Sequence, residues 1–402
     1  MSAEPSPQAT HPRPRPQPPQ EHRPLRARAA PALASAAPAL GAYAAVRIVG
    51  LVVFWAAASA AGKDAFHLLA ERWDSIWYQR VAEHGYGYTV TLPDGGIHSD
   101  LAFFPLLPAL ERGIAEVTPL GLSGAGLLVA WAAGLVAAWG IFAVGARLYG
   151  RRAGVVLAAL WGAYPTAFVQ SMAYTETLFT ALAAWSLYAV LTRRWIVAGA
   201  LCVLAGLTRP SAAALIAALG ITAAVTLVRE YRAGATDGIV RRNVRMLAGV
   251  VLAPLGWLGY VVFAAVREGS PFAYFDVQAQ WGNSIDGGAA LAAFVLGLPL
   301  PGALGLCAAL AGLGWLVYLC VRQRQPLPVL VYGIAVVVIS LIGSGYFGSR
   351  PRLMMPAFPL LLPPAVALLR LRSTARTATV LAVLAAASAG YGAWTLLGSG
   401  PP

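Results

Sequence analysis

Long apolar runs separated by short polar or basic stretches dominate the chain from residue 39 onward. An α-helix of roughly 17 to 25 apolar residues is long enough to cross a bilayer. The pattern predicts eleven such helices, and it predicts that residues 289–301, interrupted by Pro299 and Pro301, form a re-entrant or interfacial piece. The predicted spans are 39–61, 122–146, 153–169, 174–192, 195–208, 210–228, 246–266, 302–321, 327–347, 353–369 and 377–397.

The composition agrees with a membrane protein. Hydrophobic residues make up 58% of the 402 residues and charged residues only 11%, whereas soluble domains contain about 25% charged residues. The net charge of +13 does not indicate a nucleic-acid partner, because the basic residues lie in short segments between apolar runs and not on one soluble face. We therefore expect an all-α polytopic membrane protein that binds membrane lipid and no nucleic acid.

The first 38 residues differ from the rest. They hold ten of the 29 prolines, several arginines and almost no large apolar side chains. Such a segment cannot bury enough apolar surface to offset the entropy of ordering it. The sequence predicts a disordered cytoplasmic tail over residues 1–38, followed by a transmembrane domain over residues 39–398.

The charged residues predict the orientation in the cell membrane. With a cytoplasmic N-terminus, every cytoplasmic segment is basic, as is typical of multi-pass proteins. Eight of the 16 acidic residues then fall in one external segment, residues 62–121. That segment is far longer than a connection between helices requires, and long loops usually carry function. We expect it to contain the active site.

Within residues 62–121, large apolar side chains recur every three or four positions, which predicts one amphipathic helix lying on the bilayer surface. Asp74 and Tyr78 flank this apolar stripe, which would place the Asp74 carboxylate at the depth of the lipid headgroups. Phe103 and Phe104 resemble a second interfacial element. The stripe consists of Phe66, Leu69, Trp73, Ile76, Trp77 and Arg80.

Asp74 is the leading candidate for a catalytic base. An aspartate beside Trp73 could be an ordinary surface charge, but the surrounding aromatic residues and a second carboxylate at Asp100 favour catalysis. His84 and His98 could bind a metal ion together with these acids, although no pair has the spacing of a helical metal site. We therefore expect no cofactor, and a divalent metal is a minority alternative.

The other external turns carry an acid and several arginines. Glu176 opens a predicted span, and Arg209, Arg350 and Arg352 lie on the side that usually contains few basic residues. A guanidinium matches phosphate oxygens through its planar fork of donors, so a lipid phosphate is one explanation. Pairing with the acidic loop is the other, and both stay open. The aromatic segment 268–288 is best explained as a membrane-interface belt.

Several short motifs resemble one family, the PIG-V type (GPI mannosyltransferase 2-like) of mannosyltransferase, including its bacterial relatives. The motifs occur in the family's order and cover most of the membrane domain. They are Trp73-Asp74, Trp77-Tyr78, Ala82-Glu83-His84-Gly85-Tyr86, Ala102-Phe103-Phe104-Pro105-Leu106-Leu107-Pro108, Thr175-Glu176, Leu207-Thr208-Arg209-Pro210 and Arg352-Leu353-Met354-Met355-Pro356-Ala357-Phe358-Pro359.

This resemblance implies a GT-C-type glycosyltransferase bundle, a catalytic acid in the first external loop and a polyprenyl-phosphate-linked sugar donor. The family's acid corresponds to Asp74. The chain departs from the family where Ser99 follows His98, so that the second acid is displaced to Asp100. A single lysine among many arginines suggests a bacterial source, where a glycan or glycolipid of the cell envelope would be the acceptor.

The sequence thus predicts an inverting mannosyltransferase that uses polyprenyl-phosphate-mannose on the external face. Asp74 would take a proton from the acceptor hydroxyl, while arginines hold the departing phosphate. Trp73, Trp77, Tyr78 and the two loop histidines would bind substrate. A transporter or flippase of lipid-linked saccharides is the alternative, although the acids lie in a loop and not at the membrane midplane. A non-catalytic assembly scaffold is a third possibility.

Overall fold

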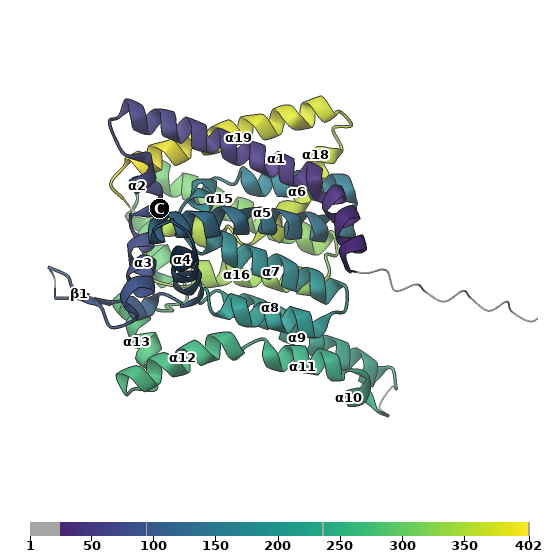
Figure 1. The fold of residues 1–402 in the computed structure, drawn as a ribbon. Coiled ribbons are helices and arrows are strands. Elements are labelled where there is room, and N and C mark those ends of the chain that lie inside the picture. Colours follow the sequence, from purple (N-terminus) through teal and green to yellow (C-terminus); the bar gives the residue numbers. More distant parts are fainter. Residues whose placement is uncertain (1–24, 94, 235–236, 401–402) are drawn as a thin grey trace, which may run out of the picture.

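The computed structural model describes residues 25–93, 95–234 and 237–400, and only the backbone of residues 25–32. The described chain is a helical bundle with one small antiparallel sheet, in which β1 (Thr89–Thr91) pairs with β2 (Ile97–Ser99). Figure 1 shows the long helices running beside one another, with α2, α3, α4 and β1 gathered at one end and α10 and α18 toward the other. The predicted all-α membrane fold is confirmed.

Six helices in the described part of the chain are long and apolar enough to cross a membrane, or seven if one bent pair counts as a span. The chain is therefore a multi-pass membrane protein. Each of these helices coincides with a predicted span. They are α1 (Leu25–Ala60), α5 (Leu122–Tyr149), α9 (Ala212–Arg232), α11 (Val244–Leu252) continued by α12 (Leu255–Glu268), α15 (Leu300–Arg322) and α19 (Thr374–Leu397).

Four other predicted spans are shorter helices, so the expected count of eleven spans is not confirmed. The shortest have 12 residues and reach only about 18 Å, less than the ~30 Å hydrocarbon thickness. They nonetheless form the core, because α5 packs against α6 and α7, and α7 against α8. The four are α6 (Arg151–Gly162), α7 (Glu176–Leu191), α8 (Trp195–Gly206) and α16 (Leu327–Leu341).

At the N-terminus the helix starts earlier than predicted. Helix α1 begins at Leu25, so residues 25–38, which we had expected to belong to the disordered tail, are helical. Alanine dominates the segment 34–39, and alanine has the highest helix propensity of all residues. The rest of the predicted tail, residues 1–24, lies outside the described residues.

The predicted span 153–169 is interrupted. Helix α6 ends at Gly162, and after Pro165 the chain forms a short 3-10 helix, η2 (Ala167–Ser171). Proline cannot donate a backbone hydrogen bond, and free backbone groups inside a membrane must find other partners. Arg47 of α1 supplies one, because it donates to the Gly162 carbonyl at 3.2 Å and to the Ser171 hydroxyl at 2.7 Å.

A second break divides the predicted span 353–369. The chain bends by 74° between the part ending at Met354 and the part beginning at Phe358, where Pro356 interrupts the helix. Arg352 precedes the bend, and Arg370 follows the helix beyond it. The pieces are η3 (Phe347–Ser349), α17 (Arg350–Met354), η4 (Phe358–Leu361) and α18 (Leu362–Leu369).

Three short helices complete the second half of the bundle. The apolar piece predicted at 289–301 contains α14, which ends before Pro299 and has no buried residue. It lies after the short helix α13 and before the long helix α15. The three are α10 (Ile239–Arg242), α13 (Ala273–Gln280) and α14 (Ala289–Gly297).

The segment 62–121 folds differently from our prediction of one amphipathic helix. It forms α2 (Ala65–Ala70), α3 (Asp74–His84), η1 (Asp100–Ala102) and α4 (Leu106–Val117). The predicted stripe is split at Trp73, whose φ of 56° ends any continuous helix. Leu69 is consequently buried, while Phe66 and Ile76 are exposed.

Helix α4 packs against α5 through an unusual contact. The Glu111 side chain is fully buried, and neither of its oxygens has a hydrogen-bond partner among the described residues. It fits because the facing residue is Gly126, where a Cβ atom would lie 2.5 Å from Glu111 Oε1. Burial raises the pKa of Glu111 from 4.5 to about 9, so the carboxyl is neutral at neutral pH.

This buried acid predicts a pH-dependent stability. Between pH 4.5 and about 9 the unfolded chain loses a proton that the folded chain keeps, so the free energy of unfolding falls as the pH rises over that range. Glu111→Gln should flatten this dependence in thermal unfolding measured in detergent. Glu116→Gln, on the exposed face of the same helix, is the control and should keep the wild-type slope. An unchanged slope in Glu111→Gln would contradict the assignment.

Candidate active site

Asp74 begins helix α3 and forms an ion pair with an arginine far along the chain. Its Oδ2 lies 2.8 Å from NH1 of Arg352, which precedes the bend in the broken span. The backbone N–H of Asp74 donates to the Tyr174 hydroxyl at 3.2 Å, and the Arg352 guanidinium lies over the Tyr174 ring. The loop acid is thus fixed against the membrane bundle from two directions.

Glu176 extends this pair into a row of four alternating charges. Its Oε1 lies 3.5 Å from Nε of Arg352 and 3.1 Å from NH1 of Arg209. The side chains of these three residues are 3–11% exposed, whereas that of Asp74 is 30% exposed. Three members of the row Asp74–Arg352–Glu176–Arg209 are therefore buried, and Asp74 is its solvent-accessible end.

The local sequence explains the positions of two members of the row, Glu176 and Arg209. Glu176 is the first residue of α7, where the positive end of the helix dipole stabilises a carboxylate. Arg209 lies in the turn between α8 and α9, immediately before Pro210, which ends the preceding helix. The same turn is bonded to the segment 62–121, because the Leu207 carbonyl accepts the Leu106 N–H at 2.9 Å.

Tyr78 and Thr175 connect α3 with the start of α7. Their hydroxyl groups are 3.3 Å apart, and the Thr175 side chain forms no cap hydrogen bond on α7. Burial, and next the negative charges of Asp74 and Glu176, raise the pKa of Tyr78. The phenol stays protonated at neutral pH and can donate a hydrogen bond beside the charged row.

Aromatic side chains continue outward from Tyr78. Phe103 meets the Tyr78 ring edge-on, Trp77 stacks on Phe103 with centroids 5.5 Å apart, and Trp281 meets Trp77 at 5.0 Å. His98 stacks on Trp281 at 4.0 Å. Trp281 belongs to the segment that we had assigned to an interface belt, but its indole donates to the Ser99 carbonyl. The aromatic composition of residues 268–288 did not predict the hydrogen bond from Trp281 to Ser99.

The side-chain interactions of three predicted site residues lie outside the charged row. The Asp100 carboxylate is fully buried and accepts the backbone N–H groups of Gly87 and Tyr88, so it closes the base of the hairpin. Among the described residues, His84 pairs with the neighbouring Glu83, at 3.5 Å, on the exposed end of α3. Trp73 precedes Asp74 and packs under the Arg72 guanidinium.

Comparison with known proteins places the fold. No family model and no curated protein matches the sequence. ArnT from Cupriavidus metallidurans bound to undecaprenyl phosphate matches with a TM-score of 0.52 and 18% identity over 85% of this chain and 63% of ArnT. Its apo structure gives 0.51 and 19% over 81% and 59%. The shared fold is a GT-C-type bundle.

This chain spans less than two thirds of the ArnT length. The archaeal oligosaccharyltransferase AglB from Archaeoglobus fulgidus, in complex with an inhibitory peptide and a dolichol-phosphate, gives a TM-score of 0.47 and 15% identity over 90% of this chain and 56% of AglB. The similarity to ArnT establishes the fold.

Arg350, predicted to bind phosphate, has a different environment from Arg352. It donates to the backbone carbonyls of Ser340, Gly343 and Gly345 and lies over the Phe347 ring. These bonds hold the turn between α16 and α17. Arg350 therefore positions the segment that carries Arg352.

Arg350→Gln should accordingly lower the unfolding temperature, because it leaves backbone carbonyls without partners. The KM for a sugar donor should stay near the wild-type value. Thermal unfolding and donor titration on the same preparation would test both expectations. A raised KM with unchanged unfolding would instead place Arg350 on the donor.

Proposed function

We propose that the protein is an inverting glycosyltransferase that takes a sugar from a polyprenyl-phosphate carrier and joins it to a hydroxyl group of a glycan or glycolipid acceptor. One observation carries this proposal. A loop carboxylate, Asp74, is held by a buried row of charges from three other parts of the bundle, and it is the most exposed member of that row.

The geometry suits an inverting displacement. Asp74 accepts the proton of the acceptor hydroxyl, the acceptor oxygen bonds to the anomeric carbon, and the bond from that carbon to the phosphate oxygen breaks on the opposite face. Arg352 orients Asp74 at 2.8 Å, and the positive charges of Arg352 and Arg209 favour the negative charge that grows on the departing lipid phosphate.

A lipid-linked donor is supported by the position of the row at the end of a membrane bundle. ArnT, which shares this fold, has been solved with undecaprenyl phosphate bound. We propose mannose as the sugar because of the resemblance of the motifs around Asp74, Glu176 and Arg352 to the PIG-V type. We further propose a cytoplasmic N-terminus, an external active site and a cell-envelope acceptor.

The test is transfer of labelled mannose by membranes that express the chain. Polyprenyl-phosphate-mannose and a nucleotide-linked mannose serve as alternative donors, over a panel of glycolipid acceptors and with or without chelator. We expect transfer from the lipid-linked donor alone, insensitive to chelator. Movement of intact donor across vesicles without transfer would support the flippase alternative, for which the two broken helices are the structural argument.

A further inference from the structure

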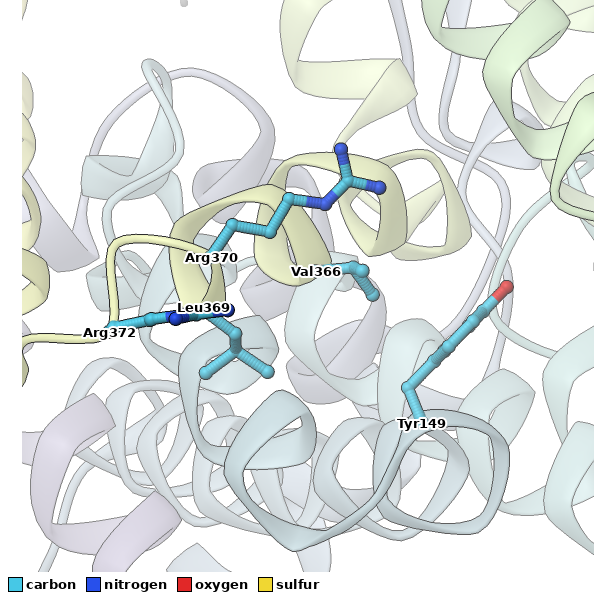
Figure 2. A pocket seen from close by; sticks show the side chains of 5 residues that line it. All are labelled: Tyr149, Val366, Leu369, Arg370 and Arg372. Carbon is cyan, nitrogen blue, oxygen red and sulfur yellow. The ribbon is translucent and has the colours of Figure 1, made fainter.

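A second site lies at the end of the bundle opposite Asp74. A cavity of about 510 Å³ is lined by Tyr149, the last residue of α5, and by residues of α18 and the turn after it. Helix α5 leaves the loop at Leu122 and runs 28 residues, about 42 Å, before it reaches Tyr149. The cavity is therefore remote from the charged row. Figure 2 shows its lining: Tyr149, Val366, Leu369, Arg370 and Arg372.

The lining combines two cations with an apolar surface. Arg370 and Arg372 are exposed, and neither forms an ion pair with a described acidic residue. Val366, Leu369 and the Tyr149 ring supply the apolar part, and the Tyr149 hydroxyl donates to Gln323 of the neighbouring helix end at 3.3 Å. A ligand that satisfies both parts has an anionic group and a hydrocarbon body.

One of these arginines has a strained backbone conformation. Arg372 has a φ of 51°, a left-handed conformation that glycine usually adopts after a helix and that strains other residues. Arg193, after α7, has a similar φ of 60° and is exposed next to Arg194, but neither lines the cavity. Arg193 and Arg194 therefore carry the same charge as Arg370 and Arg372 but do not line the cavity, so they can serve as a control pair.

We propose that this cavity binds the headgroup phosphate of an anionic phospholipid from the membrane leaflet at this end of the bundle. The two guanidinium groups take the phosphate oxygens, and the acyl chains lie along Val366 and Leu369. A phospholipid, and not a soluble phosphate, is indicated because Val366, Leu369 and the Tyr149 ring form an apolar part of the lining, and because the cavity lies at the end of the membrane helix α5.

The test measures lipid binding by the purified full-length chain. The protein is stripped of lipid in detergent and titrated with phosphatidylglycerol, phosphatidylcholine or inorganic phosphate, and bound lipid is counted by native mass spectrometry. We expect preference for phosphatidylglycerol, and about thirtyfold weaker binding in Arg370→Gln/Arg372→Gln, because each arginine near an anionic headgroup contributes about fivefold. Arg193→Gln/Arg194→Gln should bind as the wild type does.

Arg372→Gly separates binding from folding. Glycine relieves the left-handed backbone, so the unfolding temperature should not fall while the affinity for phosphatidylglycerol drops about fivefold. Equal binding of phosphatidylcholine, or equal losses in the two double variants, would overturn the proposal. So would displacement of the lipid by inorganic phosphate at the same concentration, which would assign the cavity to a soluble anion.

Discussion

Asp74→Asn should lower the rate of sugar transfer by about 10²–10⁴-fold, because an amide cannot take up the proton of the acceptor hydroxyl. The side chain keeps its size, and its amide oxygen can still accept the hydrogen bond from Arg352. We therefore expect donor binding to change little while turnover falls. Initial rates at saturating donor, together with retention of labelled donor by the purified variant, would measure the two effects separately.

The matched control for this prediction lies on the same helix. Glu83 is an exposed carboxylate near the end of α3, and among the described residues its ion-pair partner is His84. Glu83→Gln removes the same charge from the same helix and should leave the rate unchanged. If Asp74→Asn and Glu83→Gln had the same activity, the role of Asp74 as the base would be refuted.

Arg352→Gln should reduce both activity and stability. It leaves the 3% exposed Glu176 with only Arg209 and removes the partner of Asp74. Breaking a buried ion pair costs about 3–5 kcal/mol, because a charge stays buried without its partner. Denaturant unfolding in detergent should show a loss of this size, and transfer should fall with it.

Two comparisons isolate the cause of that loss. The exposed pair Arg112–Glu116 is 2.9 Å long, close to the 2.8 Å of Arg352–Asp74, but Arg112→Gln should cost less than about 1 kcal/mol because surface pairs are solvated. Adding Asp74→Asn to Arg352→Gln should restore part of the stability, since the second change removes the charge left without an ion-pair partner. A double variant as unstable as the sum of its parts would show that the two residues act independently.

The sequence predicted the members of the charged row but not their pairing. Asp74, Glu176, Arg209 and Arg352 could be identified because a charge at the edge of an apolar span is costly and needs a reason. Two explanations for the arginines stayed open, phosphate binding and pairing with the acidic loop. The structure shows that Arg352 pairs with Asp74 across 278 positions, and such a separation leaves no periodic signal in the chain.

The breaks in regular structure were the main features that the sequence did not reveal. Trp73 gives no hint of a positive φ, so the apolar spacing around it was read as one helix. The position of Asp100 was not predicted either, because a buried carboxylate that accepts backbone N–H groups has the same sequence signal as a reactive one. The helical fold itself was predictable, since it follows from composition and the length of apolar runs alone.

The bonds of Arg47 have a consequence for biosynthesis. Its partners, Gly162 and Ser171, are 115 and 124 positions further along the chain, so they do not yet exist when the first helix enters the membrane. An arginine in the middle of a helix costs about 2.5–3.5 kcal/mol on insertion. The first helix therefore carries this cost until residues 162 and 171 have been synthesised and have reached the membrane.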